Sequence, residues 1–216
     1  MFKILSDTHK IIAKIIHNRI KDDYDLDLNL EKLQWGAIAP DVLPYYRLKR
    51  HYKDESLEYI AKEIVNLILF CRYANLKNAA SPVLMDHISK KLGIISHYLA
   101  DFVCYPHAHR LTFIGNMKNH IKYESELNIF VLQHKFEEKQ YQNVIGRKDL
   151  NLYEEIDIKL KTRVMNYIDD IVDEYMSEEA SFDRDMNFAV DLNTRIAYFV
   201  IESIMLYRED LEVQFN

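Results

Sequence analysis

"SPVLMDHISKKLGIISHYLADFVCYPHAHR", residues 81–110, contains a helix start, an apolar helical run and a helix stop in one stretch. Ser81 followed by Pro82 predicts a start, because proline suits the first helical position. Pro106 predicts a stop, because proline cannot continue a helix. We therefore expect a helix over about 82–102. Its last part and the following turn hold three histidines and an aspartate, which form either a chance cluster or half of a metal site.

The rest of the chain also favours helices. Only four glycines and four prolines punctuate 216 residues, which leaves little turn chemistry for a many-stranded sheet. Isoleucines recur at helical spacing near the N-terminus. We expect an all-α fold in one domain spanning 1–216, with 40–55 as a loop and Gly36 and Pro40 closing the helix before it. The expected helices are 9–20, about 30–40, 57–76, 82–102, 118–141, 152–178 and 184–212.

Composition excludes several classes of protein. A formal net charge of −6 and a pI near 5.8 argue against an extended nucleic-acid surface, which needs clustered basic residues. The sequence has no apolar run of membrane-spanning length, and its N-terminal apolar stretch is too short for a signal peptide. We therefore predict a cytoplasmic protein with Cys71 and Cys104 as free thiols; the sequence leaves the oligomeric state open.

Histidines and carboxylates four residues apart share a helix face, as do His97 with Asp101 and His120 with Glu124. This spacing alone is weak evidence, since helices favour such pairs on their surfaces as well. The order of the motifs is more informative. Along the chain come His9, Pro40 followed by Asp41, His51, the H-x3-D pair, His107 after a proline, and the H-x3-E pair.

This order resembles the zinc-dependent phospholipases C, which include bacterial phosphatidylcholine-hydrolysing enzymes and the catalytic domain of clostridial alpha-toxin. The resemblance covers about residues 9–124 through spaced motifs. The family has H-Y-x-G-D and then a histidine after a proline, which here are "HYLAD" and "YPH". Its upstream Pro-Asp pair and histidine correspond to "APD" and "RHY", and its downstream H-x3-E corresponds to "HIKYE".

The resemblance implies two zinc ions and a share in a third. The implied ligands are His51, His97 and Asp101 for one ion, His107, His120 and Glu124 for a second, and His9 with Asp101 for the third. Asp41 is implied as the general base, or as the group that orients the attacking water. Imidazole and carboxylate ligands suit zinc, and zinc ions close together can polarise a phosphoryl group and acidify a bound water.

The implied function is therefore hydrolysis of the glycerol–phosphate bond of phospholipids or related headgroup diesters. Tyr45, Tyr46 and Tyr52 lie near Asp41 and His51 in the sequence. They are candidates for a substrate-binding pocket, with cation–π contact to choline as one option, or they pack the loop. Two alternatives stay open: a zinc phosphodiesterase related to single-strand nucleases, and a helical binding or scaffold protein in which zinc only braces the fold.

The chain departs from the family pattern in three places. Secreted members use an N-terminal tryptophan at the third zinc, whereas this chain starts at Met1. His9 could therefore bind a third ion completed by water, act with the backbone near Met1, or cap its helix. Ala100 stands where the family often has glycine, and Arg110 stands where it often has asparagine. Both changes are compatible with the fold and would reshape the pocket.

Overall fold

Helix α4 (Pro82–Phe102) runs through the middle of the protein. Ser81 caps it, because the serine side chain accepts a hydrogen bond from the Leu84 N–H at 3.2 Å, and Pro82 occupies the first turn. Every residue from 92 to 102 is buried. The predicted helix 82–102 is confirmed, and because a helix that is buried all round must be surrounded by other elements, it forms the centre of the bundle.

The computed structural model describes residues 6–76, 81–111, 117–136 and 156–215, and these residues form helices and no strand. The elements around α4 are α1 (Ser6–Tyr24), α2 (Leu30–Val42), the 3₁₀ helix η1 (Pro44–Leu48), α3 (Lys53–Cys71), α5 (Tyr105–Ala108), α6 (Met117–Val131), α7 (Ile156–Ser177) and α8 (Phe182–Phe215). The predicted all-α fold is confirmed.

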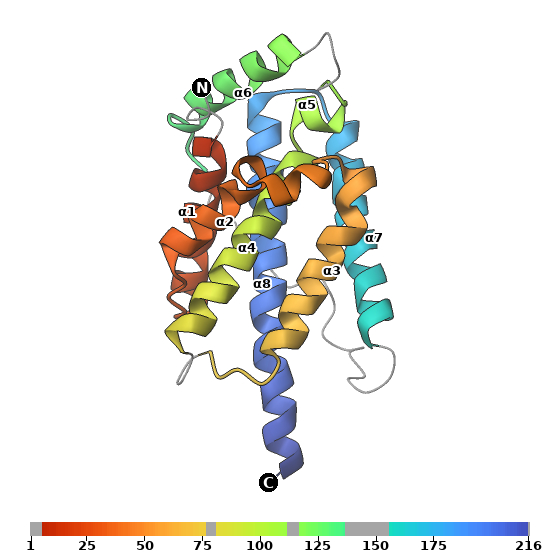
Figure 1. The fold of residues 1–216 in the computed structure, drawn as a ribbon. Helices are drawn as coiled ribbons and strands as arrows, with labels where there is room; N and C mark the ends of the chain where they lie inside the picture. The colour runs from red at the N-terminus through yellow and green to blue at the C-terminus, as the bar shows by residue number, and fades with distance from the viewer. Residues whose placement is uncertain (1–5, 77–80, 112–116, 137–155, 216) are drawn as a thin grey trace.

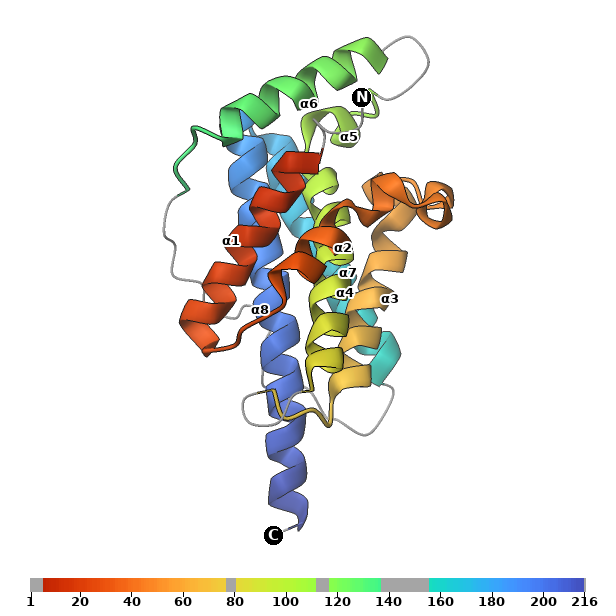
Figure 2. The same cartoon turned by 60° about the vertical axis from the view of Figure 1, so that its left-hand side comes forward.

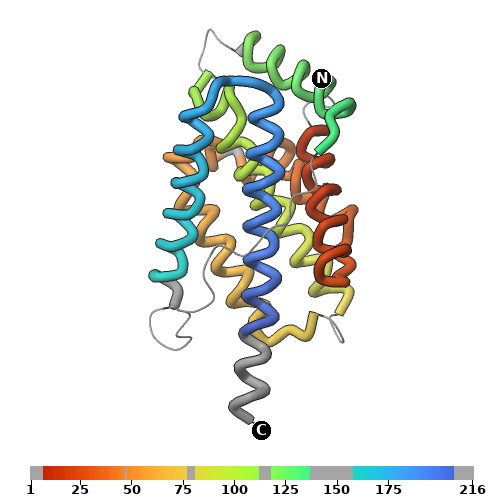
Figure 3. The backbone as a smooth tube through the Cα atoms, turned by 180° about the vertical axis from the view of Figure 1, so that it is seen from behind, coloured from red at the N-terminus to blue at the C-terminus, as the bar shows by residue number. Residues whose placement is uncertain are grey.

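The helices pack around one apolar core, to which α1, α3, α4, α7 and α8 contribute long buried faces. Helix α8 passes behind α4 (Figure 1) and, from the opposite side, lies between α7 and α1 (Figure 3). Helix α6 lies across one end of the bundle (Figure 2). The first turn of α1 and the last turn of α4 come together at this end, where His9 Nε2 lies 3.5 Å from Asp101 Oδ1. Within the described residues, no helix is long and apolar enough to cross a membrane.

The contact between α2 and α4 is made by two glycines. A Cβ atom on Gly93 would lie 2.1 Å from the Leu33 carbonyl oxygen and 2.9 Å from the Gly36 Cα. A Cβ atom on Gly36 would lie 2.2 Å from the Lys90 carbonyl oxygen. All three distances are well inside van der Waals contact, and the atoms met are backbone atoms that cannot swing away. Only glycine at both positions lets the two helix backbones approach this closely.

Gly36 therefore has a different role from the predicted one, and the expected loop 40–55 is wrong over most of its length. Gly36 and Pro40 lie inside α2, which continues to Val42. The buried Pro40 is tolerated one turn from the end of the helix. The chain then forms η1, with Pro44 in its first turn, and α3 begins at Lys53.

Other helix boundaries also shift. Helix α3 covers Lys53–Cys71 rather than 57–76, with acidic residues in its first turn that suit the helix dipole. Helix α6 ends at Val131 rather than at 141, because the N–H groups of Gln133 and His134 both turn back to the Phe130 carbonyl. The predicted positions 137–141 and 152–155 lie outside the described residues. The predicted free thiols, Cys71 and Cys104, are confirmed.

Gly93→Ala tests the close approach of α2 and α4. Alanine normally stabilises a helix interior by about 1 kcal/mol relative to glycine. Here we expect the free energy of unfolding to fall by about 1–3 kcal/mol, because the new methyl group must push α2 away. Urea denaturation measures the difference. Lys90→Ala, at an exposed position on the same helix, is the control; a more stable Gly93→Ala protein would contradict the interpretation.

Candidate metal centre

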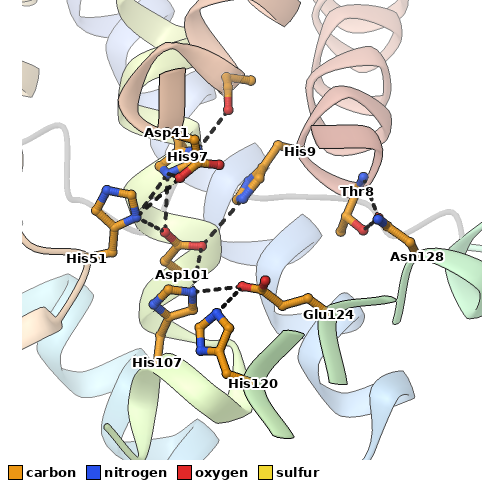
Figure 4. Close-up of polar contacts among 11 residues, drawn as sticks. Thr8, His9, Asp41, His51, His97, Asp101, His107, His120, Glu124 and Asn128 are labelled. Atoms are coloured by element: carbon orange, nitrogen blue, oxygen red, sulfur yellow. Dashed lines mark hydrogen bonds and ion pairs between the residues drawn. The ribbon is translucent and has the colours of Figure 1, made fainter. Parts of the chain in front are cut away.

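Eight side chains that the sequence singled out converge in one cluster (Figure 4). They come from five helices and from the segment before α3. Helix α1 supplies His9, α2 supplies Asp41, and the segment before α3 supplies His51. Helix α4 supplies His97 and Asp101, α5 supplies His107, and α6 supplies His120 and Glu124. Their ligand atoms form three groups, and within each group all the atoms lie within 4.8 Å of one another. The structure thus brings the predicted ligands and the predicted base together.

The Asp101 carboxylate lies at the centre of the cluster and is buried. Its Oδ2 atom lies 2.8 Å from His51 Nδ1 and 3.2 Å from His97 Nε2. Its Oδ1 atom lies 3.5 Å from His9 Nε2 and 3.8 Å from His107 Nε2. The two oxygens therefore face different pairs of imidazoles, which is the arrangement of a carboxylate that bridges two cations.

His97 is oriented by the neighbouring helix. Its Nδ1 lies 2.8 Å from the Ala37 carbonyl oxygen of α2, so Nδ1 carries the proton and donates to that oxygen. The backbone contact at Nδ1 turns Nε2 toward Asp101 Oδ2 and His51 Nδ1, each 3.2 Å away, so Nε2 is the nitrogen placed to bind a metal. Such a backbone contact on the far side of the ring is typical of metal-binding histidines.

A second group joins α5 to α6. Glu124 Oε1 lies 2.7 Å from His120 Nε2 and 3.1 Å from His107 Nε2. Burial alone would raise the pKa of Glu124, but its hydrogen bonds to the two imidazoles lower the pKa to about 2. The carboxylate is therefore ionised at neutral pH and available as a ligand together with the two nitrogens.

The third group consists of His9, Asp41 and His97. The rings of His9 and His97 stack with their centroids 4.1 Å apart, and Asp41 Oδ1 lies 3.6 Å from His97 Nε2. Sequence analysis paired His9 with Asp101, and their side chains do lie in contact range. The structure adds Asp41 to the atoms around His9, so this carboxylate occupies a position suited to a ligand as well as to a base.

The charges of the cluster fit a bound cation. Burial and the neighbouring His97 lower the pKa of His9 to about 4, so this imidazole is neutral at physiological pH. Burial raises the pKa of Asp101, but the charges of His107 and His97 outweigh burial and hold this pKa well below its usual range. Asp101 Oδ2 is buried without a well-formed hydrogen bond. An ionised carboxylate oxygen that faces two imidazole nitrogens is the donor set that zinc prefers.

The three predicted substrate-binding tyrosines lie in different surroundings. Tyr46 is buried in the core, and Tyr45 is 76% exposed and packs edge-on against it. Tyr52 lies beside the cluster, with its ring centroid 6.5 Å from that of His107. The guanidinium of Arg110 lies over the Tyr52 ring at 4.7 Å.

Asp185 is a supporting residue that sequence analysis missed. This buried carboxylate, in the first turn of α8, accepts hydrogen bonds from the Tyr105 N–H, the Tyr123 hydroxyl and the Tyr175 hydroxyl, each at 2.8 Å, and it pairs with Arg184 at 3.0 Å. It thereby anchors α5 and α6, which carry three of the proposed ligands, to α7 and α8. Its donors are spread over four elements, so no local pattern in the sequence reveals the role.

Comparison with known proteins agrees with the geometry. The model of a family described as zinc-dependent phospholipase C matches residues 8–182. These residues include all eight side chains of the cluster and the whole bundle up to the start of α8. No curated protein and no solved structure gives a match to compare with the chain.

Asp185→Asn tests the anchor. An amide can accept fewer hydrogen bonds than a carboxylate and leaves Arg184 without its charge partner in a buried place. We expect the free energy of unfolding to fall by about 3–5 kcal/mol, as when one partner of a buried ion pair is removed. Thermal or urea denaturation measures the change. Asp183→Asn, an exposed aspartate on the same turn, should stay within about 0.5 kcal/mol; equal effects of the two substitutions would refute the anchor role.

Proposed function

Because the chain belongs to the zinc-dependent phospholipase C family, we propose that it hydrolyses the glycerol–phosphate bond of phospholipids or of related headgroup diesters. One observation carries the proposal: the two Asp101 oxygens face different pairs of histidines at the centre of a buried cluster. A purely structural zinc site is closed by four protein ligands around one ion. A divided cluster of eight donors favours a catalytic centre with several ions.

The proposed zinc ligands follow the three groups of donor atoms. His51, His97 and Asp101 would hold one ion, His107, His120 and Glu124 a second, and His9 with Asp41, His97 or Asp101 a third. When bound, zinc supplies Lewis-acid stabilisation of phosphoryl oxygen charge and acidifies a water molecule. We propose that the active protein binds two zinc ions. Binding of a third ion would need ligands in addition to His9.

Asp41 is proposed as the general base. Its side chain is 35% exposed, whereas that of Asp101 is 5% exposed, so solvent reaches Asp41 far more readily. Asp41 Oδ1 lies 3.6 Å from His97 Nε2 and 3.8 Å from His51 Nδ1. In this position the carboxylate can accept a proton from the attacking water at the edge of the cluster. Asp101, buried among imidazoles, is better suited to holding charge than to exchanging protons.

Substrate contacts are proposed for the tyrosines near the site. Tyr52 is the best supported of the three, because its ring lies beside His107. The exposed Tyr45 could reach a substrate that extends over η1, whereas the buried Tyr46 would act by supporting the Tyr45 ring.

Zinc analysis of two variants tests the bridging carboxylate. Asp101 faces both halves of the cluster, whereas Glu124 faces one. We therefore expect Asp101→Asn to lose more bound zinc per chain than Glu124→Gln, when both are dialysed against the same buffered zinc concentration and measured by atomic absorption. His109→Gln removes an exposed histidine just after α5 that lies outside the cluster, and this variant should retain the full complement of zinc. Equal zinc loss in the Asp101 and Glu124 variants would remove the bridging role.

The rate of hydrolysis by the Asp41→Asn variant, measured together with its zinc content, distinguishes a general base from a zinc ligand at this position. With a chromogenic phosphocholine diester, we expect zinc-dependent hydrolysis by the wild-type protein that a chelator abolishes. Asp41→Asn should retain its zinc while the rate falls by about 10²- to 10⁴-fold, the usual contribution of a general base. Loss of zinc in this variant would make Asp41 a ligand instead. Asp27→Asn, at an exposed aspartate outside the cluster, should hydrolyse the diester at the wild-type rate.

A further inference from the structure

A cleft of about 380 Å³ opens beside His107. Its walls come from the start of α3, from the turn that carries α5, and from the last turns of α7. The apolar side chains that line it are Phe102, Ala108, Val172 and Met176. The volume is within the range of small-molecule sites. Because His107 belongs both to this cleft and to the metal cluster, the cleft adjoins the proposed catalytic centre at this side chain.

The charged side chains at the rim of the cleft already have partners. Lys53 pairs with Asp169 and, at 3.3 Å, with Asp173. Arg110 pairs with Asp54 and Glu55, which lie at the start of α3. Both cations are therefore already paired with carboxylates, and an anionic ligand would have to break these pairs to reach either of them.

The aromatic surface of the cleft is also occupied. The Arg110 guanidinium lies 4.7 Å from the centre of the Tyr52 ring. Arg110 itself has a φ angle of +52°, a left-handed conformation that is uncommon for arginine. Its two ion pairs and the stacked ring hold the side chain in place despite this backbone conformation. A quaternary ammonium group needs an open aromatic face, and Arg110 already occupies one face of the Tyr52 ring.

We propose that this cleft binds the uncharged, apolar alcohol arm of the substrate, so that an alkyl or acyl chain lies along Phe102, Val172 and Met176 while the phosphate lies at the metal cluster. The inference rests on the proposed function for the position of the phosphate. It adds a direction: the apolar arm points toward α7, and a charged headgroup points away from Tyr52. The site therefore selects its substrates by the length of the apolar arm.

Alkyl phosphates of increasing chain length are the probe. Each methylene group that becomes fully buried contributes about 0.8 kcal/mol, which corresponds to about a fourfold change in affinity. We expect the dissociation constants of butyl, hexyl and octyl phosphate for the zinc-loaded protein, measured by titration calorimetry below their micelle concentrations, to fall by about two- to fourfold per methylene. The lower value applies because the cleft is partly open to solvent.

Substitutions at Met176 locate the effect. Met176 is 42% exposed on α7, so a change there should leave the fold intact. Met176→Glu places a negative charge beside the alkyl chain of the ligand and should remove most of the dependence of affinity on alkyl length. Met176→Leu should keep this dependence. Ile158→Glu introduces the same charge at a 69% exposed position near the other end of α7 and should also keep it.

The outcomes are distinguishable. Equal length dependence in Met176→Glu and Ile158→Glu, or no length dependence in the wild-type protein, overturns the inference. If the chromogenic diester is still hydrolysed in that case, the proposed function stands without it. If alkyl phosphates do not bind in a zinc-dependent manner and the diester is not hydrolysed, both proposals fail together.

Discussion

The close contact between Gly36 and Gly93 sets the distance between α2 and α4, and the metal centre depends on this distance. The same approach brings the Ala37 carbonyl within 2.8 Å of His97 Nδ1, which fixes the orientation of that ring. It also brings Asp41, one turn beyond Ala37, to within 3.6 Å of His97 Nε2. A packing constraint between two backbones thus determines the position of both a proposed ligand and the proposed base.

The charges of the clustered side chains favour metal binding more than they favour the stability of the fold. Five imidazoles and three carboxylates lie close together in a largely buried volume. Burial disfavours charged groups, and adjacent imidazoles resist simultaneous protonation. Opposite pKa shifts result: His9 is lowered to about 4, whereas the charges of Asp101 and Asp41 overcome burial and raise the pKa of His97 to about 9. Divalent cations would balance the carboxylates without requiring protons on the rings.

The sequence predicted which side chains come together better than it predicted the structure of the chain between them. Sequence alone predicts two of the contacts, His97 with Asp101 and His120 with Glu124, because helix periodicity places each pair on one face. Gly36 was misinterpreted as part of a helix end, since a glycine at a helix crossing and one at a helix terminus look alike without the partner helix. Asp185 was missed for a related reason: its donors come from four elements, and only the tertiary fold brings them together.

Asp185 also links the walls of the cleft to the metal centre. Its carboxylate binds Tyr175 of α7, the residue just before Met176, and the Tyr105 N–H, two residues before His107. Helix α7 therefore cannot slide along its axis without disturbing the turn that presents His107. A new substrate preference would have to be engineered by exchanging side chains at positions 172 and 176 on a fixed backbone. Changes in the length or pitch of α7 would carry a penalty at the proposed catalytic centre.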